Sequence, residues 1–242
     1  MNAEEILTDC IDSLTEKGID KSQCSLIKEK KHELNVDSGE ISLLRTTLDT
    51  DFHITAIKNK RKGSISLNKI DKESVEKALD NVSALLETSE VDEAYDIAAN
   101  QKSAKFFSGL DEPDLDKMYV LLEDFIKKTG DNYPDINLEQ VIFQFNRREK
   151  YLQNSNDVNL KSNRGIYSFT AMFSAKNEEK TTSFNHTSFS IDKLEKDLME
   201  CGSIKNLFKQ SVAQLKAKPF AGKFTGDVII TPDCLNNIKI GR

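Results

Sequence analysis

Histidine is scarce in this sequence of 242 residues, which limits the metal chemistry that the chain offers. His32, His53 and His186 lie far from one another in the sequence. A helical zinc motif needs two histidines about four residues apart on one face, and no such pair is present. His32 and His53 fall on predicted strands of one sheet. They either form a paired metal site or are ordinary hydrogen-bonded histidines. We therefore predict no catalytic, cofactor-binding or metal-binding residue.

Cysteine is also sparse, and its spacing is not that of a zinc ribbon or a disulfide framework. We predict that Cys10, Cys24, Cys201 and Cys234 are reduced and mostly buried, with a zinc site built from them as the alternative. A nucleophilic cysteine needs a histidine base that the fold brings close to it. The sequence also lacks the GxSxG, GxxxxGKS/T and GxGxxG motifs of hydrolases and nucleotide-binding proteins.

Long apolar runs are absent, since no stretch approaches the roughly 20 residues that a membrane-spanning helix needs. The opening residues, MNAEEILTDC, carry acids where a secretory signal carries positive charge. The net charge of −6 provides no overall positive field to attract nucleic acid or anionic lipid. These features predict a cytoplasmic protein without a membrane or nucleic-acid partner.

The periodicity that is present predicts an α+β unit over residues 1–88. Apolar residues recur at helical spacing over 3–14 and again from Val75 to Leu86, where Asp71 is the expected cap. Between these helices, alternation and turn signals over about 22–67 predict short strands in an antiparallel meander. Two helices on one face of a meander bury its apolar side chains.

A second unit is predicted at residues 114–220, after an acidic linker at 89–113. Asp114 caps a helix that Gly130 is expected to end, and strand patterns follow up to about Ser190. Two further helices close this unit. The predicted fold class is α+β, with two units that each contain an antiparallel sheet packed by helices.

Two features have both a functional and a structural explanation. The basic turn Lys58–Lys62 either contacts phosphate or serves as a solubilising, edge-protecting turn. The region Gly165–Ser190 either accepts an extended peptide at an exposed strand edge or packs its aromatic side chains in the core. These aromatic residues are Tyr167, Phe169, Phe173, Phe184 and Phe189.

Three patches resemble the TldD/PmbA family, whose members are known as modulators of DNA gyrase and as peptide-maturation proteases. Glu33–Leu86 is similar to the family's N-terminal layout of a sheet, an S-x-N/D-x-L segment and a helix. Tyr151–Ser155 resembles the family's NS-x-G turn, with Asn156 and Asp157 where glycine is usual. Lys216–Leu235 resembles the junction with the C-terminal metallopeptidase domain.

The resemblance implies a subunit that does not carry the active site. In active members an HExxxH zinc motif follows the strand matched here by Val228–Ile230, and this sequence has no histidine after His186. Residues 221–242 are then the start of an incomplete C-terminal metallopeptidase-type domain in a longer protein. The chain is identified as PmbA-type (TldE-like).

The family resemblance also implies partners and a reaction. We expect a heterodimer with a TldD-type catalytic subunit that carries the zinc, or self-association, and hydrolysis of unfolded peptides by the assembly. This chain itself is expected to bind no zinc. The alternative, from another class, is a non-enzymatic interaction module that binds gyrase-related or antitoxin-like clients.

Overall fold

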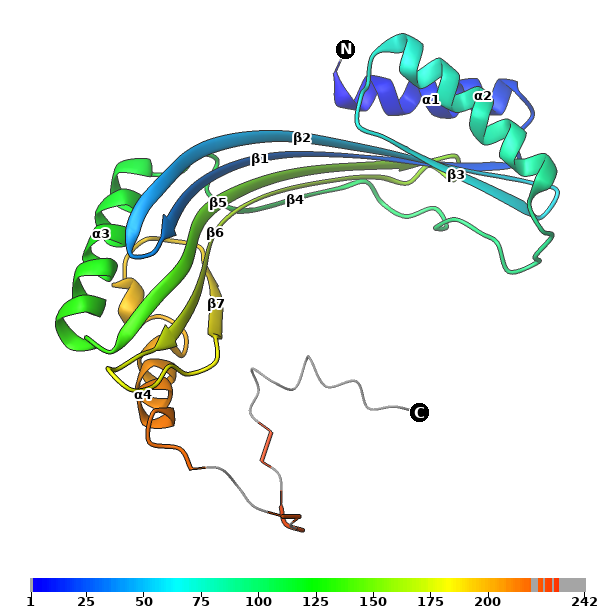
Figure 1. Ribbon diagram of the computed structural model, residues 1–242. Helices are drawn as coiled ribbons and strands as arrows, with labels where there is room; N and C mark the ends of the chain where they lie inside the picture. The colour runs from blue at the N-terminus through cyan, green and yellow to red at the C-terminus, as the bar shows by residue number, and fades with distance from the viewer. Residues whose placement is uncertain (1, 219–221, 224, 228, 231–242) are drawn as a thin grey trace.

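The computed structural model describes residues 2–218, 222–223, 225–227 and 229–230 (Figure 1). Its fold is α+β, as predicted. The elements in chain order are α1 (Ala3–Glu16), β1 (Lys21–Asp37), β2 (Glu40–Lys58), β3 (Arg61–Leu67), α2 (Lys72–Thr88), β4 (Ala104–Gly109), α3 (Leu115–Asn132), β5 (Ile136–Asn154), β6 (Asn159–Ala175), β7 (Asn185–Ile191), the short 3-10 helix η1 (Leu198–Glu200) and α4 (Ile204–Gln214). Among the described residues, no helix is long and apolar enough to cross a membrane.

A single seven-stranded sheet connects the two predicted units. Its strand order is β3-β2-β1-β5-β6-β4, and β7 also pairs with β6. The long strands β1, β2, β5 and β6 are antiparallel neighbours. β4 pairs in parallel with Leu160–Gly165, and β7 pairs antiparallel with Tyr167–Phe173, so both lie along the same side of β6.

This continuous sheet corrects the expectation of a separate sheet in each unit. β1 and β5 pair from Gln23 opposite Asn154 to Asp37 opposite Gln140, which joins the two meanders. Alternation in a sequence indicates the buried face of a strand but not the strand beside it. The predicted linker also contains a strand, β4. The boundaries at residues 88, 113 and 220 stay a prediction, and the predicted domain start at 221–242 lies largely outside the described residues.

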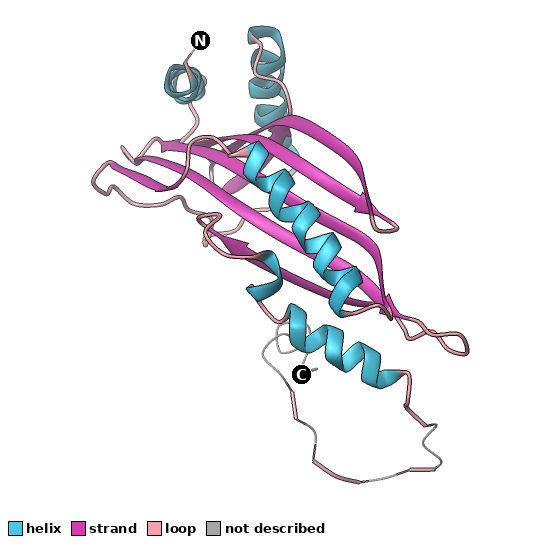
Figure 2. Ribbon diagram, turned by 90° about the vertical axis from the view of Figure 1, so that its left-hand side faces the viewer, coloured by secondary structure: helices cyan, strands magenta, loops and turns pink. Residues whose placement is uncertain are grey.

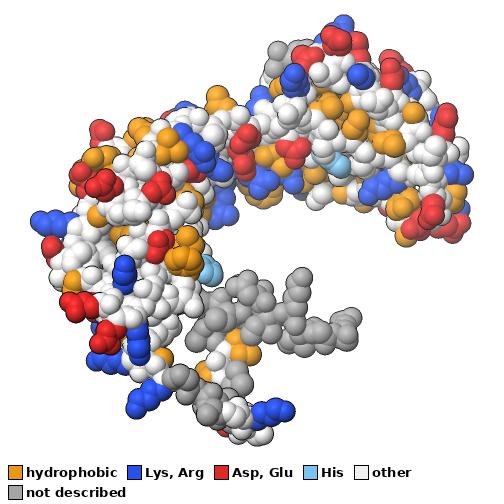
Figure 3. Space-filling view, viewed as in Figure 1, with side chains coloured by type: hydrophobic (Ala, Val, Ile, Leu, Met, Phe, Trp, Pro, Cys, Tyr) orange, Lys and Arg blue, Asp and Glu red, His pale blue; other side chains and the backbone are white. Residues whose placement is uncertain are grey.

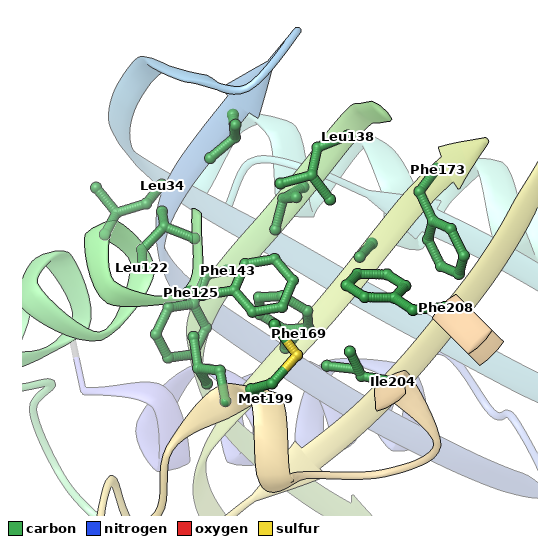
Figure 4. Close-up of a cluster of buried hydrophobic side chains, with 14 of the residues drawn as sticks. Leu34, Leu122, Phe125, Leu138, Phe143, Phe169, Phe173, Met199, Ile204 and Phe208 are labelled. Atoms are coloured by element: carbon green, nitrogen blue, oxygen red, sulfur yellow. The ribbon is translucent and has the colours of Figure 1, made fainter. Parts of the chain in front are cut away.

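The helices pack on one face of the sheet, where they cover two separate hydrophobic cores (Figures 1 and 2). The first core lies between α1, α2 and one end of β1 and β2, and includes Leu7, Leu26 and Phe52. The second lies between α3, η1, α4 and the other end of the sheet. Its centre is a group of aromatic rings in edge-to-face and tilted contacts (Figure 4). These rings belong to Phe125, Phe143, Phe169, Phe173 and Phe208.

Local hydrogen bonds explain where several elements begin and turn. Asp71 accepts a bond from the backbone N–H of Ser74, and Asp114 accepts one from Lys117, so both predicted caps are confirmed. The turn between β5 and β6 places Asp157 at a φ of 59°. Aspartate tolerates this left-handed conformation better than most residues, which explains how the turn forms without glycine.

Candidate functional site: the concave face of the sheet

The face of the sheet opposite the helices is concave, and the space-filling view shows a hollow beneath it (Figures 1 and 3). We call it the concave face. Strand residues that alternate with the core residues lie on it, and most of them are polar or charged. At one end it is crossed by residues of the acidic segment, since Lys62 Nζ lies 5.7 Å from the centre of the Tyr95 ring and Lys21 Nζ lies 2.6 Å from Asp96 Oδ1.

A row of charged residues crosses the middle of the concave face. Glu29 on β1 lies opposite Asp49 on β2 and opposite Arg148 on β5, which in turn lies opposite Arg164 on β6. The Arg148 Nε atom is 3.3 Å from Glu29 Oε1. Like charges placed directly opposite each other in a sheet are destabilising, so the acid pair and the arginine pair each cost stability. The row therefore has an acidic half and a basic half that suit binding to charged groups.

A second row contains a buried carboxylate. The side chain of Glu33 is 6% exposed, and its Oε1 atom lies 2.9 Å from an Arg45 guanidinium nitrogen. The Asn35 amide donates a further bond of 2.9 Å to the same oxygen. A buried charge needs such partners because leaving it unpaired is costly. These contacts hold the acid and fix the position of Arg45 at the edge of the sheet.

Two buried acceptor atoms on the concave side of the sheet have no hydrogen-bond partner among the described residues. They are Asn35 Oδ1 and Asn146 Oδ1. Nearby, the Gln144 amide donates to Ser168 Oγ at 3.0 Å. Because the two asparagine oxygens are buried, the groups that the concave face can offer to a polypeptide are its arginines, which can bind carboxylates. The concave face thus offers binding groups for a polypeptide.

The structure does not bring the predicted histidine pair together. His32 belongs to the helix-covered side of β1, and its Nδ1 atom lies 2.9 Å from Thr46 Oγ1. His53 lies on the concave face and bonds to Ser66 and Thr55. Within the described ranges, no three His, Cys, Asp or Glu side chains are placed to hold a metal ion. The described residues therefore do not fit a zinc site.

Stability should depend on the protonation of His32. Burial lowers the pKa of His32, Lys30 adds to the effect, and Glu112 opposes it. Because the folded pKa lies below the usual value near 6.5, the unfolded chain takes up the proton first as pH falls. We expect the contribution of neutral His32 to the free energy of unfolding to be full above about pH 6.5. It should be lost as pH drops through the lowered pKa. Urea unfolding of the native chain and His32→Gln at pH 5, 6, 7 and 8 measures it, and equal pH slopes would contradict it.

The basic turn contacts the acidic segment that follows α2. Lys60 forms an ion pair with Glu93, and Asp92 donates its backbone N–H to the Lys60 carbonyl oxygen at 2.8 Å. Arg61 donates to the carbonyl oxygen of Ser89. Phosphate would have to compete with these contacts, so the geometry favours the structural explanation of this turn.

The cysteines and aromatic residues are mainly structural. Cys10, Cys24 and Cys201 are buried free thiols, and Cys234 lies outside the described residues. A hydrogen bond with Cys10 and burial raise the pKa of Cys24, which disfavours the reactive thiolate. Most of the aromatic rings predicted in Gly165–Ser190 belong to the second core, whereas Phe184 is 66% exposed.

The sequence did not reveal the charged row on the concave face. Alternation places Arg148 and Arg164 away from the core, but only the register of β5 and β6 sets them opposite each other. The same holds for Glu29 and Asp49, which lie on different strands. The sole local signal was the unusual number of charges within predicted strands.

Comparison with known proteins identifies the class to which this fold belongs. Residues 25–86, which include β2 and β3, match the family model described as PmbA/TldA metallopeptidase domain 1. TldE from Thermococcus kodakarensis has a similar structure, with a TM-score of 0.66 and 15% identity over 87% of this chain and 47% of that chain. No protein with a curated description matches the sequence.

Two further solved structures are named as proposed modulators of DNA gyrase. The protein from Thermotoga maritima gives a TM-score of 0.65 and 10% identity over 88% of this chain and 47% of that one. The protein from Bacteroides thetaiotaomicron gives a TM-score of 0.71 and 13% identity over 87% of this chain and 49% of that one. This chain therefore spans about half the length of these structures, and it shares their fold. Together with the domain match, they confirm the expected resemblance to the TldD/PmbA family.

Proposed function

We propose that this chain is a PmbA-type subunit that assembles with a zinc-bearing TldD-type subunit in the cytoplasm and helps to bind unfolded peptides for hydrolysis. The observation that carries the proposal is the match of residues 25–86 to a metallopeptidase-family domain. The described residues offer no donor set for zinc, so we assign the metal and the hydrolysis to the partner subunit. The likeness to TldE from Thermococcus kodakarensis supports the choice of subunit type.

The role assigned to this chain is to line the space that receives the peptide. An unfolded peptide exposes backbone N–H groups and charged side chains whatever its sequence. The exposed Arg148 and Arg164 suit the carboxylates of such a peptide. Such contacts give affinity without demanding one sequence, as a handler of varied unfolded peptides requires.

Affinity capture of the tagged chain from its native lysate tests the assembly. We expect the captured protein to include a subunit with the HExxxH motif, and the eluate to cleave a reduced, carboxymethylated protein in a zinc-dependent manner. Recovery of other proteins without such a subunit, and without cleavage, would overturn the proposal. That result would favour an interaction module, as the gyrase-modulator names of two similar structures suggest for those proteins.

Removal of the arginine pair should weaken peptide binding in the assembly. For Arg148→Ser combined with Arg164→Ser, we expect KM for an acidic peptide to rise roughly tenfold, with kcat little changed. The matched control is Lys127→Ser with Lys209→Ser, which removes two exposed charges from α3 and α4 on the other face. Steady-state cleavage of acidic and basic peptides measures the effect. An unchanged KM would exclude the concave face from peptide binding.

A further inference from the structure

One side of β2 is a long free edge. β3 pairs with β2 only from Phe52 to Lys58, whereas residues 40–51 pair with β1 on one side and with no other described strand. We call residues 40–51 the free edge of β2. An unpaired edge presents a row of backbone N–H and C=O groups that can bind another strand. Natural sheets usually shorten, cover or charge such edges. This edge has charged residues, including Arg45 and Asp49, but it is long and pairs with no other described strand.

The free edge also exposes leucine side chains. Leu44 is 61% exposed and Leu48 is 75% exposed, and both belong to the helix-bearing face of the sheet. Leu43, on the concave face, is 40% exposed. Leucines exposed beside unpaired backbone favour association, because pairing would bury them and satisfy the backbone at once.

The pattern of residues on this edge is complementary to itself. If two copies pair antiparallel around a two-fold axis at Thr46, Leu44 of each copy lies directly opposite Leu48 of the other. In the same register Arg45 lies opposite Thr47, so its two diagonal neighbours in the other copy on the concave face are Asp49 and Arg45. One register thus gives two leucine pairs and two opposite-charge contacts, against a single contact between the two copies of Arg45.

One of the residues that would make these contacts is already held in position. Arg45 is fixed by its ion pair with the buried Glu33. Asp49 faces Glu29 within its own sheet, which is an unfavourable pairing of like charges. An arginine from a second copy would relieve this repulsion. Asp49 therefore destabilises a single chain through its repulsion with Glu29, whereas in a dimer it would be stabilised by an arginine.

We infer that the free edge of β2 binds the same edge of a second copy of this chain, so that two sheets join in one antiparallel sheet across a two-fold axis. This inference does not rest on the proposed role in peptide hydrolysis, because it needs only the edge and its residues. It specifies a surface and a register for the self-association that the family resemblance implies. A TldD-type subunit at the same edge is the competing occupant.

Disulfide trapping tests both the surface and the register. The proposed register sets Ser42 opposite Thr50 of the other copy, where Cα atoms lie about 4.5–5.5 Å apart, within reach of a disulfide. The full chain with Ser42→Cys and Thr50→Cys should form a covalent dimer under mild oxidation. Each single variant is the control, since its two cysteines in the dimer would lie roughly 26 Å apart. Cys234 is replaced by serine in all variants, because the other native cysteines are buried.

Sedimentation of the 242-residue chain provides a second measurement. We expect a concentration-dependent dimer for the native chain and a roughly tenfold weaker dimer for Asp49→Lys, which would set a lysine beside Arg45 of the other copy. The same substitution relieves the repulsion with Glu29, so its unfolding midpoint should not fall. A native chain that stays monomeric, or a double-cysteine variant that links only to a TldD-type subunit, would overturn the inference.

Discussion

Replacing Phe169 with alanine is expected to lower the free energy of unfolding by about 3–5 kcal/mol. The Phe169 ring is fully buried in the second core, with ring centres at 5.0 Å from Phe125, 5.8 Å from Phe143 and 5.1 Å from Phe189. Its removal forfeits these contacts and leaves a cavity that the rigid sheet cannot fill. Urea denaturation followed by circular dichroism measures the change.

The matched control for this substitution is Phe184→Ala. Phe184 is 66% exposed, so the same change of side chain should alter stability by less than about 0.5 kcal/mol. If both variants lost similar free energy, the second core would not be the main source of stability at this end of the sheet.

Gly165→Ala is expected to cost about 2–3 kcal/mol, because the site has no room for a methyl group. A Cβ atom on Gly165 would lie 1.8 Å from the carbonyl oxygen of Leu110 and 2.7 Å from the Phe145 ring. Its neighbour across the parallel pair, Gly109, is equally crowded, with its Cβ position 1.7 Å from the Gly165 oxygen. The substitution should displace β4 from β6, which hydrogen exchange at residues 104–109 would detect.

The control for this glycine is Gly130→Ala. Gly130 lies within α3, and a Cβ atom there meets nothing within 4 Å. Alanine is the better helix former, so this variant should gain about 0.5–1 kcal/mol. A loss of stability at both glycines would mean that local backbone preference, and not crowding, decides the result at Gly165.

Much of the local structure could be predicted from the sequence because it depends on nearby residues. The apolar stripe from Val75 to Leu86 predicted α2, and the carboxylates of Asp71 and Asp114 predicted two helix starts. Alternation also placed Phe143 and Phe169 together on one side of their strands, and both are in the core. Helical and strand periods are short, so a single segment carries the whole signal.

What could not be predicted depends on pairings between distant segments. The union of two meanders into one sheet needs the register of β1 against β5. Strand registers also place His32 and His53 on opposite faces of the sheet. They likewise set the row of charged residues that ends in Arg164. The ion pair between Glu93 and Lys60 of the basic turn could not be predicted either, because a run of charges in a sequence does not show which residues they will pair with.

The pairing of β1 with β5 has a consequence for the order of events during synthesis. Gln23 lies opposite Asn154, so β1 leaves the ribosome with β2 as its only available neighbour. Its second edge stays open until residues 136–154 have been made, and contacts so distant in sequence form slowly. During that interval the nascent chain exposes a hydrogen-bonding edge to other proteins. The late pairing of β1 with β5, more than the packing of either core, should set the rate of folding and the need for chaperones.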